Sequence, residues 1–338
     1  WTGSHIDTVP NAGMFDGMAG VVAGMEAVRL LQERGATLRR SLTVVVYMSE
    51  EPTRFGLSCL GSRILAGDLT AERTASLRDA EGNSLYEMLD RLGFVPNHFK
   101  NVVKKPGEVY AFIELHIEQG NRLEKLRKPI GLVTAICAPT NLTVTVTGEQ
   151  SHAGGTSMED RRDAMMASAE ISLLLEHLAQ EASRLGSYTT GTVGLLQNIP
   201  GAVNVIPGKT IFSIDIRGVD FAVKDRMLAE LRGGISEIAR RRGITADLAL
   251  ENHDRPMICD SHVLDILRDA CGETPYAEVI SGAYHDSLFV SRFVPTAMLF
   301  VPSRGGISHS PEEWTDFVDI ARGADILADA LERLANEV

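Results

Sequence analysis

The chain lacks the features that would direct it to a membrane or to a nucleic acid. No hydrophobic run approaches the ~20 residues needed to cross a bilayer, which argues against a membrane span. Lysine and arginine number 33 against 45 aspartates and glutamates, so the net charge is -12. An acidic surface attracts neither nucleic acid nor an anionic membrane. An anionic small molecule would need a local basic group to bind.

Cysteine is also scarce. The four cysteines are scattered without a CxxC pair: Cys59, Cys137, Cys259 and Cys271. This spacing favours reduced, packed thiols in a cytoplasmic protein over a disulfide framework or a thiolate zinc site. Internal repeats, low-complexity tracts and heptad patterns are absent as well.

What is present is a chain of 338 residues with 44% hydrophobic residues, enough for two domains with substantial cores. The apolar patterns predict an α/β fold with a mostly parallel sheet flanked by helices. Continuous apolar runs predict buried strands at 42–48, 109–115 and 296–301, and amphipathic runs predict helices at 17–34 and 317–334. The chain opens at Trp1, without methionine, within a predicted strand, and we expect that an N-terminal piece precedes it.

The middle of the chain follows a different pattern. NLTVTVTG alternates as a half-exposed antiparallel strand does. Helices are predicted at 161–184 and 223–242, with further strands at 192–196, 210–217 and 244–250. This order is that of a ferredoxin-like α+β layer. We therefore predict an inserted domain at 130–250 within a catalytic domain formed by 1–129 and 251–338.

The opening segment, GSHIDTVPNAGMFDG, gathers metal-ligand chemistry beside glycines. Residues i and i+2 of a strand share a face, so Asp7 can hold the second ring nitrogen of a ligating His5. Asp16 stands directly before a predicted helix. The alternative for Asp16 is an N-cap role with no metal.

Other segments end in similar groups. Glu50 and Glu51 follow the first buried strand, where two adjacent carboxylates would repel each other unless solvated or used. A solvated loop pair is the alternative. His116 follows the second strand, and His309 lies in the loop after the third. Ligands of open parallel sheets bind beyond the carboxyl ends of the strands, so these residues are expected to converge.

The predicted cluster combines imidazole and carboxylate without thiolate. This set suits zinc or manganese, and cobalt and nickel also fit. Asp16 could bridge two ions. A two-metal site activates water and polarises a carbonyl. One of the two glutamates could then ligate metal while the other moves protons as general base.

Six motifs in order carry a family resemblance: GSHIDTVPNAGMFDG, SEEPTRFG, ELHIEQG, SHAGGTSMEDR, NVIPG with SIDIRG, and GGISHSPEEW. They resemble the amidase and carbamoylase branch of the metal-dependent aminoacylase and carboxypeptidase superfamily, from the first residues to about Trp314. That branch includes N-carbamoyl-L-amino acid hydrolases, β-ureidopropionases, allantoate amidohydrolases and ureidoglycolate amidohydrolases. The resemblance implies two metal ions. It implies these roles: one metal on His5, Asp16 and His116; the other on Asp16, Glu51 and His309; Glu50 as general base; Asp7 as partner of His5.

The resemblance also implies that the inserted domain is a lid and dimerisation module, and that the protein is a homodimer. By it, His152 stabilises the oxyanion of the tetrahedral intermediate. Asn204 and Arg217 are implied to bind the substrate carboxylate, and Gln119 the ureido group. Taken alone, His152 would be an ordinary loop histidine and Arg217 a surface charge.

Some positions depart from the branch or stay open. Relatives carry a Gly-Ala-Gly-His-Asp loop where this chain has Tyr284 before His285 and Asp286. Contact of His285 with substrate, or support of a metal ligand, therefore competes with a packing role. GGTSM and EEPTRFG also depart from the commoner patterns. EEPTRFG, SCLGSR and AYHDSLF are similar to the ureidoglycolate branch. The remaining histidines are predicted to be structural: His98, His177, His253 and His262.

The predicted function is hydrolysis of a C–N bond other than a peptide bond, in a carbamoyl or ureido substrate bearing a carboxylate. An N-carbamoyl-L-amino acid is the first candidate. Allantoate or ureidoglycolate follows, then an N-acyl amino acid or dipeptide. The alternative from another class is a catalytically silent metal-binding relative, which should have lost its general base or a ligand.

Overall fold

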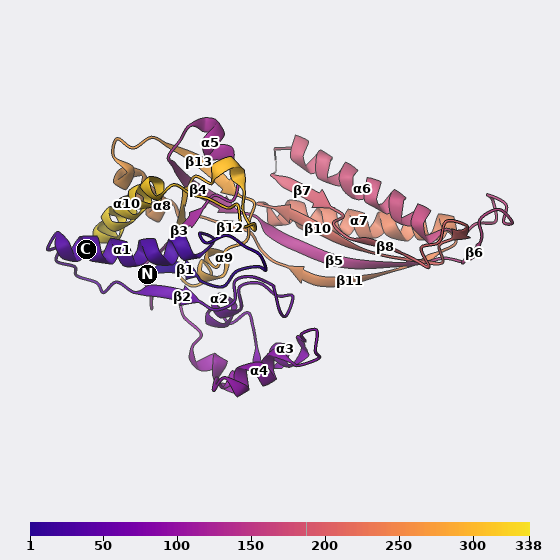
Figure 1. The fold of residues 1–338 in the computed structure, drawn as a ribbon, viewed down its shortest axis with the longest axis horizontal. Coiled ribbons are helices and arrows are strands. Elements are labelled where there is room, and N and C mark those ends of the chain that lie inside the picture. The colour runs from indigo at the N-terminus through magenta and orange to yellow at the C-terminus, as the bar shows by residue number, and fades with distance from the viewer. Residues whose placement is uncertain (187) are drawn as a thin grey trace. The chain divides into compact units, whose positions relative to one another are not determined.

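The computed structural model describes residues 1–186 and 188–338. The chain forms two compact units, and each is described by itself. The first contains residues 1–136 and 257–338, and the second contains residues 137–256. The second unit is thus inserted into the sequence of the first (Figure 1).

The first unit is built on a seven-stranded sheet in the order β12-β4-β14-β3-β1-β2, with β13 paired to β4. Most neighbours run parallel, while β12 and β14 pair antiparallel with β4. The strands are β1 (Thr2–His5), β2 (Val44–Tyr47), β3 (Phe112–Ile117), β4 (Ile130–Ile136), β12 (Met257–Ile258), β13 (Tyr276–Ser281) and β14 (Thr296–Val301). The α/β architecture with a mostly parallel sheet is therefore as predicted.

Helices cover both faces of this sheet. The alternation of side chains along β3 places Leu115 next to Gly323 of α10, while Phe112 packs with Val290 and Phe293 around α9. Helices α1 and α8 each pack against α10, and α2 packs on α9. The helices of this unit are α1 (Met18–Glu33), α2 (Leu60–Leu65), α3 (Ala71–Ser76), α4 (Leu85–Arg91), α5 (Arg122–Leu126), α8 (Ser261–Cys271), α9 (Ser287–Val290) and α10 (Phe317–Asn336), with 3-10 turns η1 (Pro96–Asn101) and η2 (Arg304–Gly306).

The second unit is a five-stranded antiparallel sheet with two helices on one face. Its strand order is β11-β5-β10-β7, and β8 also pairs with β10; β6 and β9 form a separate pair. Buried residues alternate along β5 and β10 and pack against both helices. The elements are β5 (Ala138–Thr147), β6 (Ser151–His152), α6 (Ala164–Arg184), β7 (Thr189–Thr192), β8 (Leu196–Ile199), β9 (Val205–Ile206), β10 (Lys209–Gly218), α7 (Phe221–Arg242) and β11 (Thr245–His253).

One buried lysine ties strands of the second unit together. The ammonium of Lys224 on α7 donates hydrogen bonds to the carbonyl oxygens of Ala138, Pro139 and Asp254, at 2.6, 3.2 and 2.8 Å. Burial lowers the pKa of Lys224 to about 8. All three donors of the ammonium are thus used on main-chain carbonyls.

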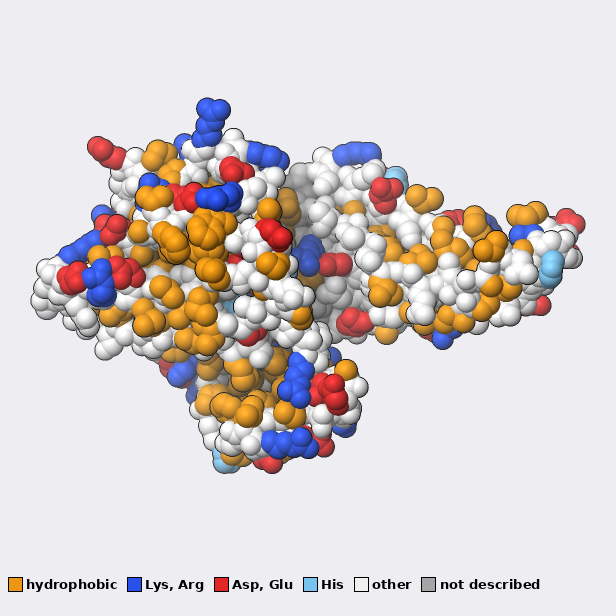
Figure 2. Space-filling view, viewed as in Figure 1, with side chains coloured by type: hydrophobic (Ala, Val, Ile, Leu, Met, Phe, Trp, Pro, Cys, Tyr) orange, Lys and Arg blue, Asp and Glu red, His pale blue; other side chains and the backbone are white. Residues whose placement is uncertain are grey.

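Three details differ from the predictions. The segment Ile130–Ile136, assigned to the inserted domain, is strand β4 of the first unit because it pairs with β13 and β14. The strand predicted at 192–196 is two short strands, β7 and β8, on either side of residues 193–195. Strand β2 is not covered on both faces, since Val46 is 49% exposed. Hydrophobic side chains gather over this part of the first unit (Figure 2). Val22 and Met25 of α1 are also exposed.

The four cysteines are buried free thiols. Among the described residues, none of the helices combines the length and the apolar character that a bilayer span needs.

Candidate metal centre

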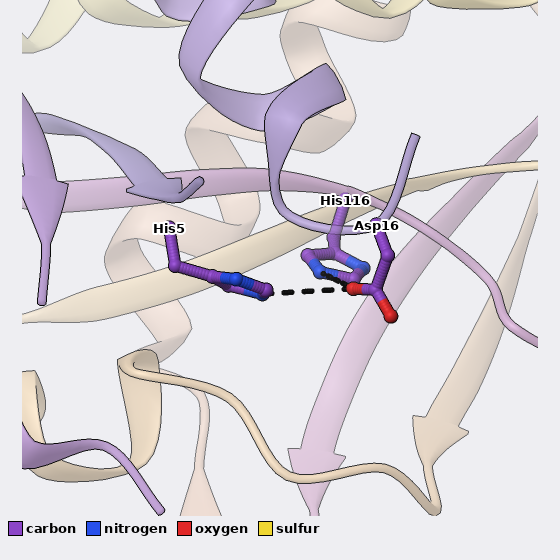
Figure 3. A group of neighbouring side chains, drawn as sticks. All are labelled: His5, Asp16 and His116. Atoms are coloured by element: carbon purple, nitrogen blue, oxygen red, sulfur yellow. Dashed lines mark ion pairs between the residues drawn. The ribbon is translucent and has the colours of Figure 1, made fainter. Parts of the chain in front are cut away.

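Two strands and the loop before α1 bring three ligand-type side chains together (Figure 3). His5 ends β1, His116 lies near the end of the parallel strand β3, and Asp16 directly precedes α1. The Asp16 Oδ1 atom lies 3.1 Å from His116 Nε2 and 3.5 Å from His5 Nε2. All three residues are buried, with at most 3% exposure. These side chains could hold one cation.

The second oxygen of Asp16 belongs to another group. Asp16 Oδ2 lies 3.1 Å from His309 Nε2, which is also 3.3 Å from Glu51 Oε1. In each group the ligand atoms lie within 4.8 Å of one another. The predicted convergence of five ligand positions around a shared aspartate is thus present in the geometry.

The imidazoles of the first group are oriented by main-chain carbonyls. His5 Nδ1 donates to the carbonyl oxygen of Asp7 at 2.9 Å, and His116 Nδ1 donates to that of Ile117 at 2.9 Å. Each Nε2 atom is therefore the ring nitrogen that faces Asp16, and it is the atom that a cation would take in place of a proton. Gly17 is required beside His5, because it has φ +65° and a Cβ atom there would lie 2.5 Å from the ring.

Asp7 acts differently from the prediction. Its carboxylate lies 3.7 Å from His5 Nδ1 and instead accepts hydrogen bonds from the amides of Glu50 and Glu51, at 3.2 and 3.1 Å. The strand ends at His5, so the expected i, i+2 alignment of side chains does not hold. The Asp7 carboxylate thus fixes the turn that carries both glutamates.

The alternatives without metal do not describe Asp16, Glu50 or Glu51. Asp16 does not cap α1, whose N-cap is Gly17 without a side-chain hydrogen bond. Glu50 and Glu51 are 6% and 7% exposed, so they are not a solvated pair. Glu50 belongs to neither ligand group; its Oε2 atom lies 3.9 Å from His5 Nε2.

The buried carboxylates of the cluster are stabilised by positive charge on the neighbouring groups. Burial would raise the pKa of Asp16, but hydrogen bonds with His116, His309 and His5 hold it well below its usual range. Burial would lower the pKa of His5, yet Asp16 and Glu50 raise it to about 10. Hydrogen bonds to Asp16 and Glu51 raise the pKa of His309 to about 10. Protons on the imidazoles thus occupy positions where divalent cations would satisfy the same carboxylates, so the donor set fits two cations.

The pKa of Glu50 is shifted in the opposite direction from that of Asp16. Burial raises the pKa of Glu50 well above its ordinary value; Asp286, Glu51 and Asp16 add to the rise, and His5 opposes it. A carboxylate with a raised pKa can accept and return a proton near neutral pH.

The remaining predicted residues of the first unit lie close to the cluster. Gln119 Nε2 donates to Asp16 Oδ2 at 2.8 Å, so its amide reaches the shared aspartate. His285 is only 1% exposed, with its ring centroid 4.6 Å from that of His116 and its Nε2 atom 2.9 Å from Ser281 Oγ. His285 thus packs against the proposed ligand His116, which fits a role in supporting that ligand as well as simple packing, and its contact with substrate stays a prediction.

His152, Asn204 and Arg217 lie in the second unit. His152 on β6 is exposed, and Ala153 N donates to the Asn204 carbonyl oxygen at 3.0 Å, so the first two residues are near each other. Arg217 on β10 contacts the carboxylate of Asp215 at 3.0 Å. Of the histidines predicted to be structural, none belongs to a ligand group among the described residues.

Two buried acids close to the cluster were not predicted from the sequence, Glu114 and Glu313. Glu114 on β3 accepts hydrogen bonds from Ser4 Oγ and Ser287 Oγ, at 2.6 and 2.5 Å. Glu313 accepts from main-chain amides of the Asp16 loop. A lone acid inside the apolar run VYAFIEL was a signal for Glu114. Nothing in the pattern distinguishes Glu313 from its neighbour Glu312.

Comparisons with known proteins show the family of the chain. A family model described as peptidase family M20/M25/M40 matches residues 1–333. The chain is 41% identical to a ureidoglycolate hydrolase of Oryza sativa subsp. japonica, over 99% of this chain and 70% of that protein. It is 38% identical to an N-carbamoyl-L-amino acid amidohydrolase of Geobacillus stearothermophilus, over 98% and 81%. A crystal structure of a hydantoinase/carbamoylase family amidase from Burkholderia multivorans superposes with a TM-score of 0.86 at 35% identity, over 99% and 80%. The chain therefore belongs to the peptidase family M20/M25/M40, within its branch of hydantoinase/carbamoylase-type amidases.

Proposed function

We propose that this chain is a two-metal amidohydrolase that cleaves a C–N bond in the carbamoyl or ureido group of a small carboxylate-bearing substrate. The observation that carries the proposal is the buried carboxylate of Asp16, whose two oxygens belong to two separate ligand groups. The relatives named ureidoglycolate hydrolase and N-carbamoyl-L-amino acid amidohydrolase support the ureido group as the target.

The proposed ligand sets are His5, Asp16 and His116 for one ion, and Asp16, Glu51 and His309 for the other. Nitrogen and oxygen donors without sulfur suit zinc or manganese first, and cobalt and nickel also fit. When bound, such ions would supply Lewis-acid polarisation of the substrate carbonyl and a lowered pKa for the attacking water.

Glu50 is proposed as the general base. It lies beside the first ligand group without belonging to it, and its pKa is raised by burial. Its carboxylate would take the proton of the attacking water and return it to the leaving nitrogen. Asp7 would keep Glu50 in place through the main-chain amide that it binds.

The second unit is proposed as a lid and dimerisation module, with His152 as oxyanion donor and Asn204 and Arg217 as carboxylate ligands. Arg217 lies eight residues along β10 from Lys209, about 26 Å at 3.3 Å per residue. His152 lies on β6, which Figure 1 draws beyond the far end of β10, at the opposite end from β7. One small substrate cannot touch His152 and Arg217 of the same unit, and this separation supports a homodimer that shares residues between copies.

A mixing experiment tests the shared site. Glu50→Gln and His152→Ala chains are expected to be nearly inactive by themselves. Mixed dimers would combine an intact Glu50 with an intact His152 from the other copy at one of their two sites. Random mixing should then restore about a quarter of wild-type activity. No recovery in verified mixed dimers would place His152 and Glu50 in the same chain's site.

Substrate class is tested by an ammonia-release screen on protein loaded with zinc or manganese. Ureidoglycolate, N-carbamoyl-L-amino acids and allantoate are expected to release ammonia or urea-type products, and N-acetyl amino acids are not expected to turn over. Ureidoglycolate should be tested first in the screen, since it is favoured by the motifs EEPTRFG and AYHDSLF and by the relative at 41% identity. No turnover of any of these compounds by metal-loaded protein would favour the silent alternative. A cytoplasmic location stays a prediction from the sequence.

A further inference from the structure

A third carboxylate, outside both ligand groups, lies buried next to the candidate metal centre. Glu313 is 3% exposed. Its Oε1 atom accepts hydrogen bonds from the main-chain amides of Phe15 and Asp16, at 3.0 and 3.1 Å. Its Oε2 atom accepts from Ser308 Oγ at 2.7 Å. One side chain thus connects the loop that carries the shared aspartate to the residue next to His309.

The side chain of Glu313 is tightly packed against the Asp16 loop. A Cβ atom on Gly13 would lie 2.3 Å from Glu313 Cβ and 2.5 Å from its Oε1 atom. The Asp16 loop therefore rests directly on the carboxylate. A buried carboxylate is costly unless its oxygens are hydrogen-bonded, and here each oxygen has a donor from a different loop.

The same contacts close a ring. Gln119 Nε2 donates to Asp16 Oδ2 at 2.8 Å and approaches Ser308 Oγ at 3.3 Å. Ser308 donates to Glu313, and Glu313 accepts from the amide of Asp16. The ring joins the loop before α1, the end of β3 and the loop after β14.

The two ligand groups differ in how they are held. His5 and His116 stand on hydrogen-bonded parallel strands, and their side chains are buried. His309 lies in a loop, and its side chain is 49% exposed. The group that includes His309 therefore depends more on the contact between Ser308 and Glu313.

We propose that Glu313 is the positioning residue that holds Asp16 and His309 at the spacing needed to bind two cations together. This inference rests on the proposed two-metal function. Loss of the tether should weaken the cation at Asp16, Glu51 and His309 by about 10- to 100-fold, the usual effect of removing a group that orients metal ligands. The cation at His5 and His116 should be affected less.

The test measures metal binding directly. Glu313→Ala removes both ends of the tether, and Glu313→Asp keeps the charge but shortens the side chain by one methylene group. Ser308→Ala removes the end next to His309, together with the longer contact from Gln119, and leaves the hydrogen bonds of Glu313 to the Asp16 loop in place. Glu312→Ala and Glu312→Asp are matched controls, because Glu312 is exposed and its carboxylate contacts Ser310.

Each protein is titrated with manganese against a competing chelator, and electron paramagnetic resonance reports the coupled pair of ions. Wild type and both Glu312 variants should bind two ions with a coupled signal. The Glu313 and Ser308 variants should bind the ion at Asp16, Glu51 and His309 (the second ion) more weakly. They should also lose the coupled signal, while their circular dichroism spectra stay unchanged. If Glu313→Ala does not fold, Glu313→Asp and Ser308→Ala decide the result.

Two outcomes separate the inference from the function beneath it. Wild-type protein that binds fewer than two ions would overturn the proposed two-metal function. Wild-type protein that binds two ions, with unchanged second-ion affinity in folded Glu313 and Ser308 variants, would overturn the positioning role alone.

Discussion

Replacing Glu50 by glutamine separates proton transfer from metal binding. Glutamine has nearly the shape of glutamate but cannot accept a proton at neutral pH. Glu50 is 6% exposed, its Oε1 atom lies 3.4 Å from Cys59 Sγ, and it belongs to neither ligand group. The substitution should therefore remove the proposed base and leave the cluster in place.

The expected loss of activity follows from the role. A positioned general base contributes about 10²- to 10⁴-fold, or roughly 2.7–5.4 kcal/mol at 1.36 kcal/mol per decade. Both kcat and kcat/KM should fall by this factor, because the base acts in the transition state. Metal content should stay at two ions per chain.

The same substitution should raise the stability of the metal-free protein, although it lowers activity. Burial raises the pKa of Glu50 in the folded, metal-free protein. Between the ordinary glutamate pKa and this higher value, the folded protein binds more protons than the unfolded chain, so stability falls as pH rises through that window. Glutamine has no charge to bury, so metal-free Glu50→Gln protein should melt at a higher temperature than wild type at pH 7.

The assay combines steady-state kinetics, metal analysis and thermal melting, with Glu312→Gln as a surface control. Turnover within a few-fold of wild type would refute the role of Glu50 as base. Loss of an ion from folded Glu50→Gln protein would instead make Glu50 a ligand. A lower melting temperature of the metal-free variant would contradict the account of its buried charge.

Further predictions concern protons, substrate and the second unit. The pKa values of His5 and His309 are about 10 in the metal-free protein, and that of His116 is also raised. Binding of both metal ions at about pH 7.5 should therefore release at least two protons, and metal affinity should rise as pH rises towards about 10. Calorimetry in buffers of different ionisation enthalpy measures the proton release, and no release would contradict the ligand assignment. Arg217→Lys should lower kcat/KM about 10- to 100-fold for carboxylate-bearing substrates, and unchanged kinetics would place the anchor elsewhere. Because burial lowers the pKa of Lys224 to about 8, wild type should gain stability between about pH 8 and 10.5 relative to Lys224→Met; parallel curves of unfolding free energy against pH would refute this.

The sequence predicted the scaffold well where hydrophobic periodicity was strong. The strand at 296–301 has the bounds of β14, and the helix at 17–34 differs from α1 by one residue at each end. Hydrophobic periodicity was less useful at the boundary between the two units, where a strand of one unit is followed directly in the sequence by the other unit. Segment Ile130–Ile136 was assigned to the wrong unit because its burial depends on β13 and β14, which lie more than 130 residues later.

The ligand positions could be predicted because they follow strand ends, and the ends of parallel strands converge. Their supporting contacts could not. The carbonyl oxygen of Asp7, rather than its carboxylate, orients His5, since the strand stops before the side chains can align. Glu313 and Glu312 are adjacent and identical in type, and only the folded loops decide which is buried.

Backbone conformation explains how separate strand ends deliver side chains to one point. Ser49, Gln119 and His309 all adopt positive φ angles, of 51°, 55° and 55°, and each is a site residue or lies next to one. A left-handed conformation costs a non-glycine residue roughly 1–2 kcal/mol, so such turns persist only where surrounding contacts hold them. For Gln119, one such contact is the hydrogen bond that its main-chain N–H donates to Ser303 Oγ at 3.0 Å. The energy of folding therefore maintains these turns, and we expect the ligand atoms to be arranged before any cation binds.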